Sequence, residues 1–212
     1  MATKLFLRNT RENPITDSGD TILYDMITTA GAAVDTDTVD TAASGTQIQW
    51  TQETTNDQSI AWISGRVPAG GFTLTATDIS VWCRESNMLA NCGGRYRVFK
   101  YSAGVVVELG GGPFDDGIEF DTTITEMIWL GDVTDTAFAE NDRILLRVYI
   151  TNIGTMDGAR TCDLQFNAAD TATGDSFFNI AETVAFKAEE VGQPFYIRDS
   201  YSLPDTVSLS QS

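Results

Sequence analysis

The sequence predicts an all-β fold, namely an antiparallel β-sandwich of the jelly-roll kind with an extended arm at each end. Roughly eight to ten short segments alternate apolar and polar residues, and no segment sustains the 3.6-residue period of a helix. Gly, Asn and Asp turns separate these segments, as is typical of sandwiches and barrels. We therefore divide the chain into an N-terminal arm (1–20), a β-sandwich domain (21–187) and a C-terminal arm (188–212).

The clearest predicted strand is Arg143–Asn152, in which Ile144, Leu146 and Val148 fall on one face. A shift of the alternation at Thr77 and Asp78 predicts a β-bulge or corner. The remaining predicted strands cover residues 47–52, 59–67, 72–76, 79–83, 96–101, 105–109, 126–130, 161–166 and 179–186.

Two segments near the N-terminal end of the domain do not read as strands. Thr21–Thr29 is the best helix candidate, although its β-branched residues lower its helix propensity. Residues 31–46 are rich in Thr, Asp and Ala, and we interpret them as a loop or a poorly buried edge.

The N-terminal arm is basic, because Lys4, Arg8 and Arg11 precede the first acidic residue. We predict that Lys4, Phe6, Arg8 and Arg11 contact a neighbouring protein. Attraction between this arm and the acidic remainder of the chain, within one subunit or between two, is one interpretation, and a solvated surface is the other.

In the C-terminal arm, apolar residues alternate with polar ones after each of two prolines. Such a segment can add a strand to a neighbour's sheet edge, or it can close an edge of its own sheet. We favour the first use and predict interface roles for Phe195, Ile197, Val207 and Leu209.

The charge excludes a nucleic-acid partner, because 13 Lys and Arg stand against 30 Asp and Glu and the net charge is −17. The acidity suits a soluble particle or a protein that docks on a basic surface. No apolar run approaches the roughly 20 residues of a membrane span, and no signal peptide is visible, so no membrane partner is expected.

The chain contains no histidine, which removes Ser-His-Asp and Cys-His arrangements and every histidine metal site. No phosphate-binding loop is present either, and we expect no catalytic residues and no cofactor. Four carboxylates that follow a glycine turn are weak calcium candidates, with solvated turns as the alternative. These are Asp115, Asp116, Glu119 and Asp121.

Three cysteines do not make a secreted disulfide framework. We expect Cys83, Cys92 and Cys162 to be free, buried thiols, and a Cys83–Cys92 bridge is the alternative. Trp62 and Trp129 neighbour loops and are candidates for stacking on sugars, with packing in the core as the competing interpretation.

Six stretches of the sequence stand out together: MATKLFLRNT, ISGRVPAGGFTL, ESNMLANCGGRYRVFKY, GGGPFDDGIEF, TAFAENDRILLRVYITNIGTM and NAADTATGDSFFNI. They resemble an uncharacterised family of tailed-bacteriophage virion proteins. The resemblance covers most of residues 1–187 and implies a virion structural role.

We therefore expect a capsid decoration or cement protein rather than an enzyme. It would be made in the host bacterial cytoplasm and carried in the virion, where it would stabilise the head shell. Its expected partners are the major capsid protein and copies of itself, as a homo-oligomer and most simply a trimer. One alternative is a tail or baseplate component that binds a host-surface glycan. Another is a carbohydrate-active enzyme that uses two acids.

Overall fold

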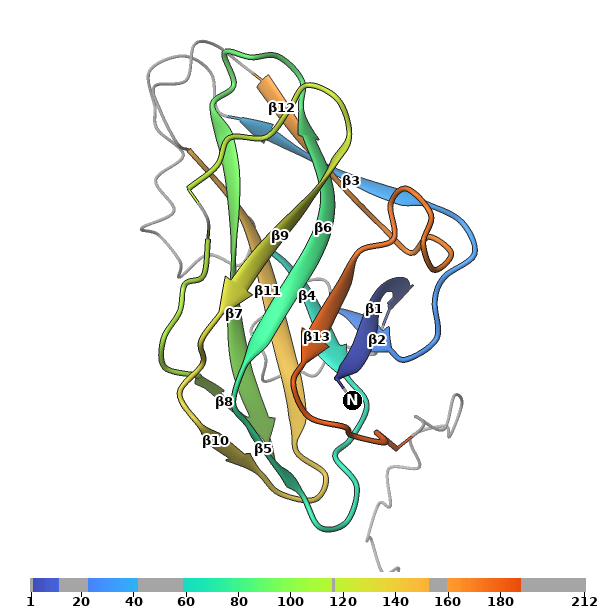
Figure 1. Cartoon of the computed structure of the whole chain (residues 1–212), viewed down its shortest axis with the longest axis vertical. Helices are drawn as coiled ribbons and strands as arrows, with labels where there is room; N and C mark the ends of the chain where they lie inside the picture. Colours follow the sequence, from blue (N-terminus) through green and yellow to red (C-terminus); the bar gives the residue numbers. More distant parts are fainter. Residues whose placement is uncertain (1, 12–22, 42–58, 116, 153–159, 188–212) are drawn as a thin grey trace, which may run out of the picture.

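The computed structural model describes residues 2–11, 23–41, 59–115, 117–152 and 160–187, and these residues form strands, turns and loops (Figure 1). The predicted all-β class is therefore confirmed for this part of the chain. Within it, no helix is long and apolar enough to span a membrane.

Thirteen strands follow one another along the chain. The first seven are β1 (Thr3–Arg11), β2 (Leu23–Ile27), β3 (Asp35–Thr41), β4 (Ser59–Ser64), β5 (Phe72–Leu74), β6 (Thr77–Glu85) and β7 (Cys92–Ser102). The other six are β8 (Val105–Glu108), β9 (Thr125–Gly131), β10 (Thr136–Phe138), β11 (Arg143–Asn152), β12 (Arg160–Phe166) and β13 (Phe177–Ile180).

Eleven of these strands belong to one sheet, in the order β3-β12-β6-β13-β1-β2-β4-β11-β7-β8, with β9 paired to β6. β5 and β10 form a separate two-stranded sheet. The pair β2–β4 is parallel, whereas the other pairs are antiparallel. The large sheet is therefore mixed, which corrects the purely antiparallel prediction.

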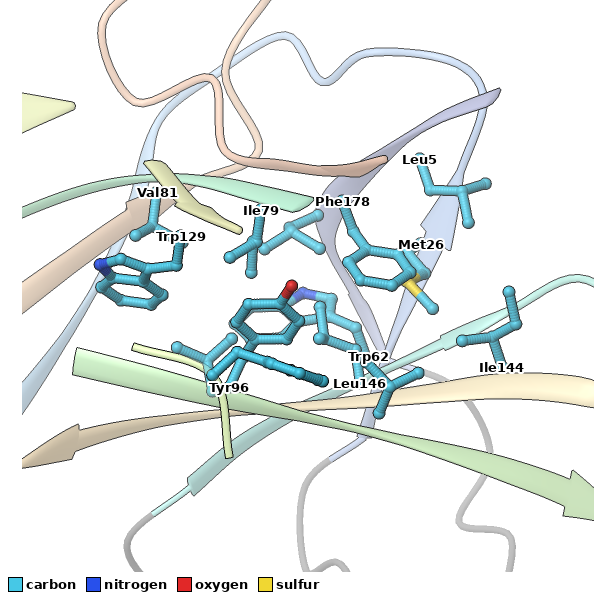
Figure 2. Packing of buried hydrophobic residues seen from close by; sticks show 14 of the residues in the cluster. Leu5, Met26, Trp62, Ile79, Val81, Tyr96, Trp129, Ile144, Leu146 and Phe178 are labelled. Atoms are coloured by element: carbon cyan, nitrogen blue, oxygen red, sulfur yellow. The ribbon is translucent and has the colours of Figure 1, made fainter. Parts of the chain in front are cut away.

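The large sheet turns back on itself and encloses the main core, as Tyr96 of β7 shows. Its hydroxyl lies 3.0 Å from the Thr77 Oγ1 of β6, and its ring centroid lies 6.2 Å from that of Phe178 in β13. Neither strand is a neighbour of β7 in the sheet, so these contacts cross the core. Figure 2 shows Tyr96, Trp62, Phe178 and their neighbours between the two parts of the sheet.

The segment predicted as an N-terminal arm contains β1, which lies between β13 and β2 inside the sheet. Leu5 and Leu7 point into the main core, and Phe6 is buried on the opposite face of the strand. These three side chains supply the alternation of a strand that is covered on both faces. Residues 3–11 are therefore part of the folded sheet and not an extended arm.

Two further segments form strands, although the sequence did not predict them as strands. The candidate helix contains β2, whose neighbours β1 and β4 hydrogen bond to both of its edges. The predicted loop contains β3, which pairs with β12 from Asp35 to Thr41. Thr and Val favour strands, and the partner strand supplies the hydrogen bonds that local sequence cannot reveal.

The strand β11 has the predicted bounds, but both of its faces are buried. Ile144, Leu146 and Val148 enter the main core. Leu145, on the other face, belongs to a second apolar cluster with Ile63 and three other buried residues. β11 is also paired on both edges, with β4 and β7, so it is a central strand.

The shift of alternation at Thr77 and Asp78 marks the passage from one sheet to another. β5 ends at Leu74 and pairs with β10, whereas β6 begins at Thr77 within the large sheet. The predicted bulge is therefore a boundary between two strands.

Cys92 and Cys162 form a disulfide, and Cys83 is buried and lies outside this bridge. The expectation of a buried thiol is therefore confirmed for Cys83 and wrong for Cys92 and Cys162, and the alternative Cys83–Cys92 bridge is wrong as well. Cys92 begins β7, while Cys162 lies in β12 opposite Glu85 of β6. The bridge therefore links the two parts of the sheet across the core, between residues that are 70 positions apart in the sequence.

Candidate functional site

The predicted interface residue Lys4 makes its contacts within this chain. Its ammonium group lies 2.8 Å from Asp170 and 3.3 Å from Asp175, and 3.8 Å from the centroid of the Phe177 ring. The hydrogen bond from Lys4 lowers the pKa of Asp170. Phe6 is buried beside it. Both side chains hold β1 against the loop that precedes β13.

Arg8 is likewise engaged within the domain. Its Nε donates to Asn167 Oδ1 at 2.9 Å, and a terminal nitrogen donates to the carbonyls of Thr29 and Ala30 at 2.8 Å. The other predicted interface side chains lie outside the residues whose side chains the structure describes. These are Arg11, Phe195, Ile197, Val207 and Leu209.

Of the calcium candidates, Glu119 and Asp121 lie near a buried carboxylate that sequence reasoning missed, Glu85. Asp115 is exposed, and Asp116 lies outside the described residues. We call Glu85, Glu119 and Asp121 the Glu85 cluster. In the part of the chain that the structure describes, no group of three or more Cys, Asp or Glu side chains is arranged to hold a metal ion.

The Glu85 cluster fastens a loop to the β6–β7 turn. The Cys92 amide donates to Glu85 Oε2 at 3.0 Å, the Glu85 amide donates to the Asp121 carbonyl at 2.9 Å, and the Phe120 amide donates to the Cys92 carbonyl at 2.7 Å. Burial raises the pKa of Glu85 above its ordinary 4.5, and a hydrogen bond to Glu119 raises it further. The hydrogen bond between Glu85 and Glu119 brings their carboxyl groups closer than the separation of about 5 Å or more in glycosidase acid pairs. The pair therefore suits a structural role.

Replacing Glu85 should change how stability depends on pH. Below pH 4.5 Glu85 keeps its proton in both the folded and the unfolded chain, whereas above its raised pKa the folded chain must hold a buried charge. Stability of the natural chain relative to Glu85→Gln should therefore fall as the pH rises from 4.5 through the raised pKa. Urea unfolding of both proteins between pH 4 and 8 measures this difference.

A matched variant checks the cause of that pH dependence. Glu119→Gln removes a neighbouring negative charge and leaves a side chain that can donate to Glu85, so the decline should become smaller. Parallel pH profiles for the natural chain and Glu85→Gln would show that Glu85 titrates normally.

The tryptophans singled out as sugar-stacking candidates are buried. Trp62 and Trp129 are both 0% exposed, and the Trp62 indole donates to the Arg8 carbonyl at 2.9 Å. They therefore cannot stack on a glycan, and packing in the core is their role. Trp82 is partly exposed on the outer face of β6.

A groove lies where β6, β9 and β13 reach the end of the large sheet near the N-terminus. We call it the outer groove, and its volume is about 430 Å³. It is lined by Ala2, Ala76, Thr77, Asp78, Leu130, Gly131, Asp132, Ile180 and Ala181.

Strand register explains the shape and chemistry of the outer groove. Asp78 and Leu130 are direct partners across β6 and β9, and Asn179 is the partner of Asp78 on β13. Small side chains dominate the next positions along these strands, so a hollow remains beside Leu130. The Asn179 amide donates to Asp78 Oδ1 at 2.7 Å and fixes one wall.

The outer groove is acidic. Among the described residues that line it, Asp78 and Asp132 carry charge, and none is Lys or Arg. The sequence signal for this site is weak, because the two carboxylates belong to different strands and are 54 positions apart in the chain. Only the pairing of β6 with β9 brings them to one surface.

The sequence matches no protein-family model and no curated protein. Solved structures do match the fold. A CocE/NonD family hydrolase from Staphylococcus aureus has a TM-score of 0.51 and 10% identity over 87% of this chain and 37% of that chain. An aminopeptidase from the marine sediment archaeon Thaumarchaeota archaeon has a TM-score of 0.51 and 7% identity over 85% of this chain and 36% of that chain. This chain thus spans just over a third of their length, and at such identity the likeness establishes the fold.

These comparisons contradict the predicted function. The similar solved structures named above are a hydrolase and an aminopeptidase, so the expectations of a capsid decoration protein, of a glycan-binding tail component and of a protein that is not an enzyme are wrong. The wrong function was inferred from the predicted β-sandwich and its arms, but a fold does not determine function, because one β-fold hosts many functions. The segment predicted as an N-terminal arm, which supported that inference, is a strand of the sheet.

Proposed function

We propose that this chain is a jelly-roll-like β-sandwich domain of a hydrolase system, and that it binds the catalytic unit. One observation carries the proposal: the fold accounts for 85–87% of this chain but for only 36–37% of the hydrolase and aminopeptidase chains. The fold therefore corresponds in size to one part of such an enzyme.

The residue composition of the chain supports a catalytic unit that is separate from this domain. A serine or cysteine nucleophile is generally activated by an adjacent base, most often histidine. The 212 residues contain no histidine. A nucleophilic hydrolase built on this domain would take that base from the unit it binds.

The described surface offers a place for such binding. Exposed Ile128 and Leu130 lie on β9 beside the outer groove, and the acidic walls of the groove lie next to Leu130. An apolar centre with charged surroundings is the common composition of a protein–protein contact.

Capture of the tagged chain from cells that make it naturally tests the proposal. The captured material is assayed with p-nitrophenyl acetate and alanyl-p-nitroanilide and then passed through a sizing column. We expect hydrolytic activity to co-elute with the chain, ahead of the position of the isolated chain. A resin that carries the tag alone is the control.

Two outcomes would overturn the proposal. The chain could elute alone, or with a partner whose hydrolysis does not exceed that of the tag control. Alternatively, the purified chain could hydrolyse these substrates unaided, which would place the catalytic groups within it and remove the need for a separate unit.

A further inference from the structure

The strand β9 presents an apolar, unpaired edge. Among the described residues it pairs with β6 alone, and no further backbone hydrogen bond joins its other edge to the chain. Its outward side chains Ile128 and Leu130 are 57% and 75% exposed. An exposed edge of this kind is a template for one more strand.

The outer groove begins where this edge ends and fits one kind of side chain. Ala2, Ala76, Ala181 and Leu130 give its lining apolar surface, and Asp78 and Asp132 supply negative charge. Lysine and arginine carry an apolar stem and a cationic head, and they bury the stem along apolar surface while the head stays accessible.

We propose that the β9 edge and the outer groove bind an extended, basic segment of a partner protein. The segment adds a strand to β9, and one of its Lys or Arg side chains lies in the outer groove. The apolar stem of that side chain covers the three alanines of the lining, and its cationic head pairs with Asp78 and Asp132. That the partner is the catalytic unit rests on the proposed function, but the chemistry of the surface does not.

Charge complementarity favours a basic segment over other occupants of the groove, such as a sugar. The chain has a net charge of −17, and the lining of the groove adds two carboxylates without a cation. Asn179 donates a hydrogen bond to Asp78 Oδ1, so Asp78 Oδ2 can accept one from the bound side chain. A sugar would require an exposed aromatic platform, and the groove lining contains no aromatic side chain.

Titration with a defined peptide tests the inference. The probe is an eight-residue peptide of alternating valine and lysine, acetylated and amidated, and its affinity is measured by fluorescence anisotropy at low and physiological salt. We expect binding that weakens with salt. The double variant Asp78→Asn with Asp132→Asn should lower the affinity at least tenfold.

Matched variants separate the site from general attraction. Asp115→Asn with Asp135→Asn changes the net charge equally at exposed carboxylates outside the groove, and it should leave the affinity nearly unchanged. Leu130→Ser should weaken binding, whereas Val107→Ser, at a residue 54% exposed on β8, should not. A peptide N-methylated along one edge should bind poorly, because it cannot form the ladder.

The inference is overturned if both double variants lose affinity equally, or if a peptide with glutamate in place of lysine binds as well. Its failure is distinguishable from failure of the proposed function. Hydrolase capture that survives the Asp78→Asn/Asp132→Asn change would reject the groove and keep the function. Specific peptide binding without any captured hydrolase would keep the groove and reject the proposed function.

Discussion

Removal of residues 2–11 should unfold the domain. β1 lies inside the large sheet and pairs with β13 on one edge and β2 on the other. It also buries Leu5, Phe6 and Leu7, each of which stabilises the fold by about 1.5–3 kcal/mol. With both ladders lost as well, the total is comparable with the whole stability of a domain, about 5–15 kcal/mol. Far-ultraviolet circular dichroism and urea unfolding of the truncated chain measure the effect.

Single substitutions make the same test in a chain that still folds. Leu7 is 0% exposed, so Leu7→Ala should lower the free energy of unfolding by about 2–5 kcal/mol. Thr10 is an exposed residue of the same strand, and Thr10→Ala should cost about 0.5 kcal/mol or less. A truncated chain with unchanged unfolding would mean that residues 2–11 behave as a detachable arm.

Loss of the Cys92–Cys162 disulfide should lower the free energy of unfolding by about 4 kcal/mol. The bridge closes a loop of 70 positions, and in the chain-entropy account a longer loop gives a larger restriction of the unfolded chain. Urea unfolding with and without a phosphine reductant measures the loss, and the variant Cys92→Ala with Cys162→Ala should reproduce it.

The third cysteine supplies the control. Cys83 is buried and takes no part in the bridge, so Cys83→Ala should have a smaller effect and should leave the response to reductant intact. Thiol titration of the unfolded, unreduced chain should find one reactive thiol. Three reactive thiols would contradict the bridge, and a chain in which Cys83 is protected would assign it to another pair.

Strands with a long local alternation were predictable, and β11 is the clearest because its period of two persists from Arg143 to Asn152. The strands that sequence reasoning missed depend on partners far away in the chain. β3 is rich in Asp and Thr and becomes a strand because β12 supplies its hydrogen bonds. β1 carries only three apolar residues, Leu5, Phe6 and Leu7, among polar ones, so its central place was not visible without β13.

The candidate site was less predictable than the fold. Lys4 and Phe6 were predicted to contact a neighbouring protein, whereas the contacts that the structure describes are with Asp170, Asp175 and Phe177 of the same chain. The outer groove gathers single residues from the ends of several strands. No stretch of sequence carries its pattern, because its hollow comes from small residues beside one large residue on another strand.

The pairing of β1 with β13 also affects how the chain can fold during synthesis. The Thr3 hydroxyl donates to the Glu182 carbonyl across 179 positions, so one edge of β1 has no partner until nearly the whole domain has been made. At 5–20 residues per second, this interval is on the order of ten to thirty seconds. Throughout it, the apolar Leu5, Phe6 and Leu7 lack one neighbouring strand. The nascent chain therefore carries an unpaired, apolar strand edge, which favours aggregation, until β13 has been made.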